Sequence, residues 1–130
     1  MDRAEVIYLD THVLIRLYLG EAKDLGDAAR RAIEGPQLLA SPAAILELEL
    51  LHEIGRMRMS ALEILAALEH DLGLRVCDLS FRAVMECALS EKWGRDPFDR
   101  LIVANARALN AVLVTKDEKI HQHYPLAVWN

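Results

Sequence analysis

The sequence has 130 residues and a net charge of −5. This length fits one compact domain, and the negative charge argues against a protein that binds nucleic acid through a broad basic surface. The two cysteines, Cys77 and Cys87, form neither a CxxC pair nor a zinc-ligand set, so we expect reduced thiols. No segment resembles a signal peptide or a membrane span of ~20 residues, and we therefore expect a cytoplasmic protein without membrane association.

Predicted strands and helices alternate along the chain. The order is strand 6–9, helix 12–19, helix 24–34, strand 37–40, helix 42–54, helix 60–72, strand 74–77, helix 81–92, helix 96–109, strand 111–115, a helical turn from 117 and strand 126–129. Serine N-caps and glycine or asparagine stops mark several helix ends. This alternation predicts an α/β fold, a single three-layer sandwich with a central parallel sheet spanning residues 1–130.

Two acids follow apolar strands. Asp10 comes directly after the strand from Val6 to Leu9, and Asp117 follows the strand from Ala111 to Thr115 after a gap of one residue. In parallel α/β sheets, ligands bind outside the carboxyl ends of the strands. We therefore expect both carboxylates at the ligand-binding edge of the sheet.

Two further acids lie on helix faces that are otherwise apolar. At ~100° per residue, Glu47 shares a face with Ala43, Ala44, Leu50, Leu51 and Ile54. Asp99 lies in the same way with Ile102, Val103 and Ala106. A buried carboxylate must be protonated, paired or bound to a cation, because leaving it unpaired costs several kcal/mol. Two independent patterns, strand ends and apolar helix faces, therefore predict that four acids lie at one site.

Each acid also has an ordinary structural explanation. Asp10 and Asp117 could cap the following helices, Glu47 could pair with a core arginine, and Asp99 could interact with the helix dipole. All four together favour a site for Mg²⁺ or Mn²⁺, because clustered carboxylates without a cation would repel one another.

Several other polar residues are candidates for this site or lie near it in the sequence. Asp96 precedes a proline and is a natural N-cap, but it is also a further candidate metal ligand. Thr11 and Thr115 could hydrogen-bond a ligating carboxylate. The histidines predict no metal-ligand set, and His121 and His123 are expected to be solvated in a polar tail.

Three segments of the chain are similar to a known family. These segments are YLDTHVLI near the N-terminus, SPAAILELELLHEIGRM in the middle, and RDPFDRLIVANARALNAVLVTKDEKI near the C-terminus. They resemble the PIN domain, and most of all the VapC-type toxins of toxin–antitoxin pairs. The resemblance covers nearly the whole chain and places the acidic quartet of the family on Asp10, Glu47, Asp99 and Asp117.

The resemblance implies a metal-dependent endoribonuclease, the toxin of a toxin–antitoxin pair. The quartet would bind one or two Mg²⁺ ions, or Mn²⁺, and one of its acids would act as general base on the attacking water. Arg16, Arg95 and Lys116 are candidates for contacts with the RNA backbone.

The expected partners are an RNA substrate, a cognate antitoxin protein and a second copy of the chain in a homodimer. The homodimer is expected because residues such as Ile45, Ile64 and Leu101 place apolar side chains on more than one helix face. Two alternatives stay open: a receiver-type phosphoacceptor domain and a catalytically inactive PIN-like interaction module.

Overall fold

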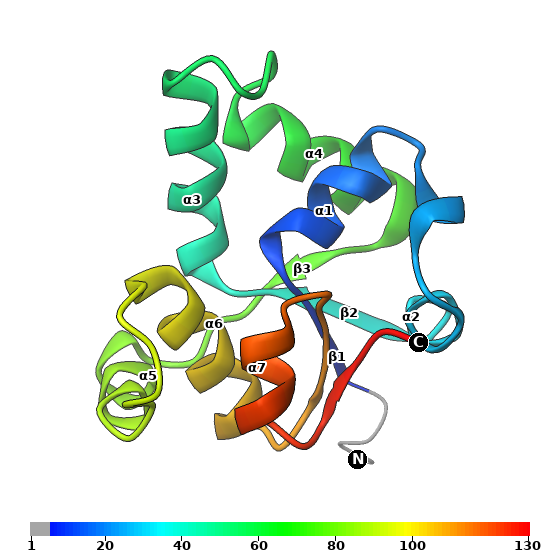
Figure 1. Cartoon of the computed structure of the whole chain (residues 1–130). Coiled ribbons are helices and arrows are strands. Elements are labelled where there is room, and N and C mark those ends of the chain that lie inside the picture. Colours follow the sequence, from blue (N-terminus) through cyan, green and yellow to red (C-terminus); the bar gives the residue numbers. More distant parts are fainter. Residues whose placement is uncertain (1–5) are drawn as a thin grey trace.

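A computed structural model describes residues 6–130 and contains one five-stranded parallel sheet (Figure 1). Its strands are β1 (Val6–Leu9), β2 (Gln37–Ala40), β3 (Arg75–Val76), β4 (Val112–Val114) and β5 (Ala127–Val128), in the order β3-β2-β1-β4-β5. Every paired neighbour is parallel. The predicted α/β class and central parallel sheet are confirmed.

The central strand β1 is buried on both of its faces. Ile7 and Leu9 pack into one hydrophobic core, and Val6 and Tyr8 pack into a second core on the opposite face. Successive side chains of a strand point to opposite faces, so a strand with helices on both sides must be apolar at every position. This explains the unbroken apolar run in the sequence.

Helices cover both faces of the sheet (Figure 1). They are α1 (Thr11–Tyr18), α2 (Asp27–Ala32), α3 (Pro42–Glu53), α4 (Ala61–Leu72), α5 (Phe81–Ala88), α6 (Pro97–Ala108) and α7 (Glu118–His123), together with a short 3₁₀ turn, η2 (Ala22–Asp24). The first core joins α1, α2, α3 and α4 to the sheet, whereas α6 and α7 contribute to the second. Helix α3 contacts α1, α4 and α6, so it lies where the two helical layers meet.

The ends of the helices follow the predicted signals. Ser41, Ser60 and Ser80 each accept a backbone N–H of the first turn of their helix, which satisfies a donor that has no partner within the helix. Gly73 ends α4 in the left-handed conformation, and Asn110 after α6 has a φ of 51°. Asparagine tolerates this conformation better than most residues.

Two of the predicted helices differ from the observed ones. The helix expected over residues 24–34 is divided into η2 and α2, because Leu25 turns into the core and Gly26 packs against the backbone of Trp129. A Cβ at Gly26 would lie 2.2 Å from the carbonyl oxygen of Trp129. The helix expected to reach Lys92 ends at Ala88, and Glu91 turns inward to bind Arg107.

The structure also bears on the apolar residues named for the homodimer and on the receiver-type alternative. Ile64, one of the apolar residues from which the homodimer is expected, is fully buried in the first core, whereas Ile45 and Leu101 are partly buried. A receiver-type domain would have the strand order 2-1-3-4-5, which is not the order observed.

Within residues 6–130, no helix combines the length and the apolar character that crossing a membrane requires.

Candidate active site

The strand order reverses between β1 and β4, because the chain proceeds from β1 to β2 and β3 on one side and reaches β4 and β5 on the other. Such a switch point opens a crevice at the carboxyl ends of the two strands. Asp10 directly follows β1, and Thr115 and Asp117 follow β4. The predicted position of the two strand-end acids at this edge is therefore observed.

Asp10 is held by hydrogen bonds from two elements. Its Oδ1 accepts the backbone N–H of Thr11 at 2.7 Å, and its Oδ2 accepts the Thr115 hydroxyl at 2.6 Å. The first bond caps α1, so the expectation that Asp10 could cap the following helix is confirmed. The second joins the ends of β1 and β4 directly. Since the side chain is almost fully buried, these bonds fix its orientation in the crevice.

Glu47 reaches the same place from α3. Its Oε1 accepts the Thr11 hydroxyl at 2.5 Å, so the residue after Asp10 holds a carboxylate from a helix 36 residues away. Burial raises the pKa of Glu47, the hydrogen bond from Thr11 lowers it, and the nearby Asp10 and Asp96 raise it.

The apolar face predicted around Glu47 is only partly buried. Ala44 has no exposed surface, but Leu50 and Ile54 are 38% and 65% exposed. Helix α3 leaves the sheet towards its C-terminal end (Figure 1), and its last turn therefore has no core to cover it. The prediction was wrong for Leu50 and Ile54, whereas Glu47 and Leu51 are partly buried and line the acidic hollow.

Asp99 lies in the first turn of α6. Burial raises its pKa, and the charges of Asp96, Asp10, Asp117 and Glu47 raise it further, to about 7. No cationic side chain contributes to this shift. The ionised form of Asp99 is therefore destabilised, because the neighbouring acids repel its charge and no counter-ion offsets them.

Asp117 and Asp96 both act as N-caps. Asp117 accepts the N–H groups of Lys119 and Ile120 at the start of α7, and Asp96 accepts those of Phe98 and Asp99 at the start of α6. The capping explanations are confirmed for both. A capping carboxylate keeps lone pairs free, and both residues also border the crevice.

A hollow of about 310 Å³ brings the acids together. Its lining consists of Asp10, Thr11, His12, Ile15, Glu47, Leu51, Asp96, Asp99 and Asp117. Five carboxylates thus border one hollow whose lining includes no lysine and no arginine. Within residues 6–130, no three acidic, histidine or cysteine side chains converge closely enough to form a coordination shell as they stand. Oxygen donors with this excess negative charge nevertheless fit a hard divalent cation.

His12 is a residue of this hollow that the sequence pattern did not indicate. Its Nε2 accepts the backbone N–H of Lys116 at 3.0 Å, so the ring proton lies on Nδ1, 3.4 Å from Oδ2 of Asp10. Burial lowers the pKa of His12, and Asp10 opposes that effect. The neutral ring therefore connects Asp10 to the loop after β4. In the sequence, its position two residues after the strand-end acid Asp10 could have indicated that it lies at this site.

The C-terminal histidines lie on a helix, α7, and both are exposed. His121 lies on α7 and its Nε2 contacts the carbonyl oxygen of Thr115 at 2.7 Å, while His123 stacks on Trp93 with ring centres 5.3 Å apart. Both residues thus belong to α7 and not to a tail, but their exposure is as expected for solvated side chains. Lys116 lies beside the acidic hollow.

The comparisons with known proteins agree with this fold. No curated protein matches the sequence. Among solved structures, the chain is similar to one in a toxin–antitoxin complex from Klebsiella pneumoniae (20% identity, TM-score 0.64, covering 94% of this chain and 95% of that chain). It is also similar to a chain of VapBC2 from Rickettsia felis bound to a promoter DNA fragment (16% identity, TM-score 0.67, covering 96% and 99%). A third similar chain belongs to DNA-bound VapBC from Salmonella typhimurium (19% identity, TM-score 0.57, covering 93% of each chain).

The sequence also matches a family model. The PIN domain model covers residues 7–124, from the first strand to the end of the last helix. The matched region includes the acidic hollow and both sides of the topological switch point. The chain belongs to the PIN domain family.

Proposed function

We propose that the protein is a metal-dependent endoribonuclease and the toxin of a toxin–antitoxin pair. The observation that carries this proposal is the hollow with five carboxylates and no lining lysine or arginine. An acidic cluster of this kind is costly for the fold, since it raises the pKa of Asp99 to about 7. A cation that the carboxylates hold for catalysis explains why such a cost is tolerated. PIN domains are generally nucleases that use divalent ions.

Asp10, Glu47, Asp99 and Asp117 would hold Mg²⁺ or Mn²⁺, and Asp96 is a further candidate ligand. When bound, the ion activates water for attack on the phosphodiester and stabilises the charge on the leaving oxygen. Thr11 and Thr115 orient Glu47 and Asp10 through their hydroxyl groups. One of the quartet acids would accept the proton of the attacking water.

The test is cleavage of mixed RNAs by the purified protein, with Mg²⁺ or Mn²⁺ and with EDTA, followed by mapping of the cleaved ends. We expect cleavage that EDTA abolishes and that Asp10→Asn reduces at least 100-fold. Asp78→Asn is the matched control, because Asp78 is exposed and does not line the hollow. Folded wild type without activity on any RNA would favour the inactive interaction module. Cleavage that survives EDTA would exclude the proposed metal chemistry.

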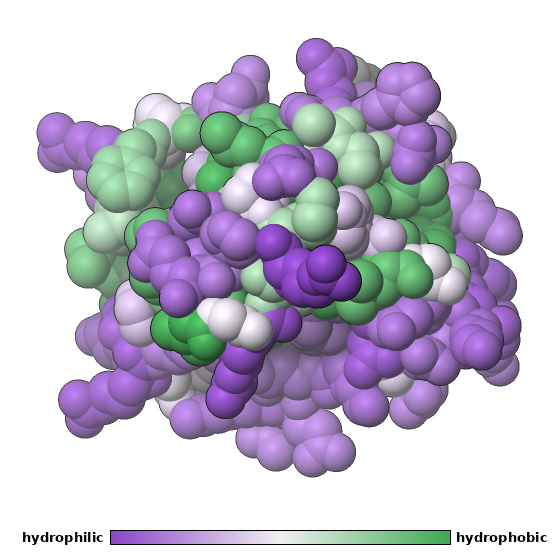
Figure 2. Space-filling model, turned by 90° about the horizontal axis from the view of Figure 1, so that it is seen from above, coloured by the Kyte–Doolittle hydropathy of each residue, from purple (hydrophilic) through white to green (hydrophobic). Residues whose placement is uncertain are grey.

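The antitoxin partner is proposed from the toxin–antitoxin complexes that share this fold and from exposed apolar side chains. Leu19 and Ile54 are 52% and 65% exposed, and Leu19 borders a hollow between the end of α1 and residues 56–59. Figure 2, which looks down on the molecule from above, shows hydrophobic side chains among hydrophilic ones on that face. An apolar helix of a partner could cover such side chains.

An antitoxin could also neutralise the acidic hollow with an arginine or lysine, since a guanidinium can bridge carboxylates in place of a cation. Titration of Mn²⁺ into the complex and into the free protein tests this idea. Weaker metal binding in the complex is expected, whereas equal affinity would place the inhibitory contact elsewhere.

We propose a homodimer from a second apolar surface, formed where α3, α5 and α6 meet. A hollow of about 380 Å³ lies there, lined mainly by apolar side chains. Leu46 and Phe81 at its border are 57% and 75% exposed, and Leu89 on α5 is 65% exposed. A symmetric pair of copies would bury this surface twice.

Sedimentation of Phe81→Ser tests the dimer. The variant should become monomeric, whereas Leu62→Ser should not, because Leu62 is equally exposed (72%) but lies on α4. A wild type that stays monomeric at high concentration would exclude the dimer.

A further inference from the structure

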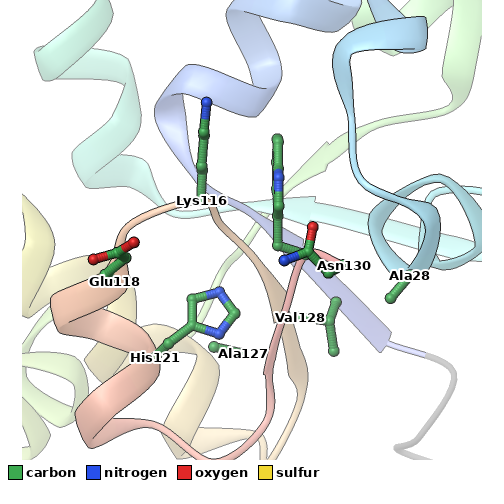
Figure 3. A pocket seen from close by; sticks show the side chains of 8 residues that line it. Ala28, Lys116, Glu118, His121, Ala127, Val128 and Asn130 are labelled. Carbon is green, nitrogen blue, oxygen red and sulfur yellow. The ribbon is translucent and has the colours of Figure 1, made fainter.

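Another hollow, of about 510 Å³, lies between α7 and the C-terminal residues of the chain (Figure 3). On one side it is bordered by Glu118 and His121 of α7, and on the other by Val128 of β5 and by Asn130. Trp129 also belongs to its lining. Its size lies within the range typical of small-ligand sites. The proposed hydrolysis does not use any of these residues.

Trp129 is held in a fixed position at this hollow. Its carbonyl oxygen accepts the backbone N–H of Ala29 at 3.0 Å, and Gly26 packs so closely against its backbone that no side chain would fit there. The residue packs against the first core but is only partly buried, so part of its surface remains accessible. An aromatic ring on a fixed backbone at the border of a hollow is a suitable surface for stacking a flat ligand.

One cation and one imidazole lie next to this indole. The guanidinium of Arg16 lies over the ring, 6.0 Å from its centre, and the ring centre of His12 is 5.9 Å away at an interplanar angle of 55°. Arg16 reaches its acidic neighbour Asp24 only at 3.8 Å, so most of its hydrogen-bonding capacity is available. Lys116 is exposed and lines the hollow itself.

The hollow is connected to the acidic site through a chain of shared residues. His12 and Asp117 line both the acidic hollow and an open depression beside it, which also includes Arg16. Lys116 and Glu118 line both this depression and the hollow at Trp129. A linear polymer lying across the carboxylates can therefore continue past Arg16 and Lys116, with Glu118 also on its path, to the indole.

We propose that the hollow at Trp129 is a nucleotide subsite, in which one unpaired base of a single-stranded RNA stacks on the indole while Arg16 and Lys116 contact the adjoining phosphates. The proposal rests on the proposed ribonuclease function. Single-stranded RNA is bound in general by base stacking on aromatic side chains beside cations. A protein with a net charge of −5 has little long-range attraction for RNA, so a local subsite is needed to hold the substrate beside the carboxylates.

Two substitutions of Trp129 separate stacking from side-chain size. Trp129→Leu should raise the KM for RNA cleavage about tenfold, the order typical for the loss of one stacked base, with little change in kcat. Trp129→Phe keeps an aromatic ring and should recover most of the affinity. Thermal unfolding of both variants identifies any loss of folded protein. Equal KM values for wild type and a folded Trp129→Leu would overturn the proposal and leave the nuclease function intact.

Binding without cleavage gives a second and independent test. The chain has two tryptophans, so Trp93→Phe leaves Trp129 as the single indole. Single-stranded RNA hexamers titrated into this variant in EDTA should quench its fluorescence, whereas hexamers of abasic nucleotides should not. The quenching requires no catalysis, so it would support the subsite even if cleavage failed. Absence of quenching by all four homohexamers, or equal quenching by the abasic ones, would refute base stacking.

Discussion

Asp99→Asn should stabilise the metal-free protein at neutral and alkaline pH. In the folded protein, burial and four neighbouring carboxylates raise the pKa of Asp99 from 3.8 to about 7. Unfolding returns the carboxyl group to its ordinary pKa. The folded state therefore binds more protons between these two values, and the stability associated with neutral Asp99 is present below pH 3.8 and is lost as the pH rises through about 7.

The magnitude follows from the difference between the two pKa values. A rise from 3.8 to about 7 corresponds to at most ~4 kcal/mol above pH 7. Asp99 keeps some contact with solvent, and its charge interacts favourably with the N-terminal end of α6. Both effects reduce the gain, so we expect Asp99→Asn to increase the free energy of unfolding by ~2 kcal/mol at pH 8.

Urea unfolding in EDTA, followed by circular dichroism, measures this difference. The gain should be largest at pH 8, smaller at pH 6 and close to zero at pH 4. Asp78→Asn is the control, because Asp78 is exposed and does not border the acidic hollow. Equal stability of wild type and Asp99→Asn at pH 8, or a gain that does not change with pH, would refute the electrostatic reasoning.

Three further predictions follow from particular contacts. Saturating Mg²⁺ or Mn²⁺ should raise the free energy of unfolding of the wild type, by ~2.7 kcal/mol at 100 times the dissociation constant, and the effect measured by thermal unfolding should shrink in Glu47→Gln. Thr115→Val removes the hydroxyl that donates to Asp10, and in metal-free urea unfolding it should cost ~1–3 kcal/mol. Gly26→Ala places a Cβ 2.2 Å from the Trp129 carbonyl oxygen, and it should lower the free energy of unfolding by ~1–3 kcal/mol.

Each of these predictions has a matched control. Glu53→Gln changes an exposed acid of the same helix and should keep the full metal effect. Thr115→Ser retains the hydroxyl and should recover most of the stability lost in the valine variant. Gly94→Ala meets no atom within 4 Å, so it should be nearly neutral. If a control changes as much as its partner variant, the contact is not the cause of the effect.

Local sequence patterns were sufficient to predict most of the elements and the general location of the site. Apolar runs indicated buried strands, and Ser41, Ser60 and Ser80 marked helix starts, because a cap involves only neighbouring residues. Asp10 was placed at the carboxyl end of a parallel strand by the alternation of elements, and this position is observed. These inferences depend on interactions within a few residues of the chain, which the sequence displays directly.

Other features depended on contacts between distant segments. The order β3-β2-β1-β4-β5 puts the switch point between β1 and β4, and no local pattern states which strands are neighbours. The bond from Thr11 to Glu47 spans 36 residues, and that from Thr115 to Asp10 spans 105. Periodicity places a side chain on a helix face but does not say what packs against that face, which is why exposed Ile54 was expected to be buried.

The amino-acid sequence alone determined that acids would gather at the carboxyl edge of a parallel sheet, since strand polarity and helix periodicity are encoded locally. The tertiary structure decided which groups surround them. It turned His12 towards Asp10, and it brought the backbone of Trp129 against Gly26, more than 100 residues earlier in the chain. Such neighbours are chosen by the packing of the whole domain, because each side chain takes the position that buries apolar surface and satisfies polar groups together with all the others.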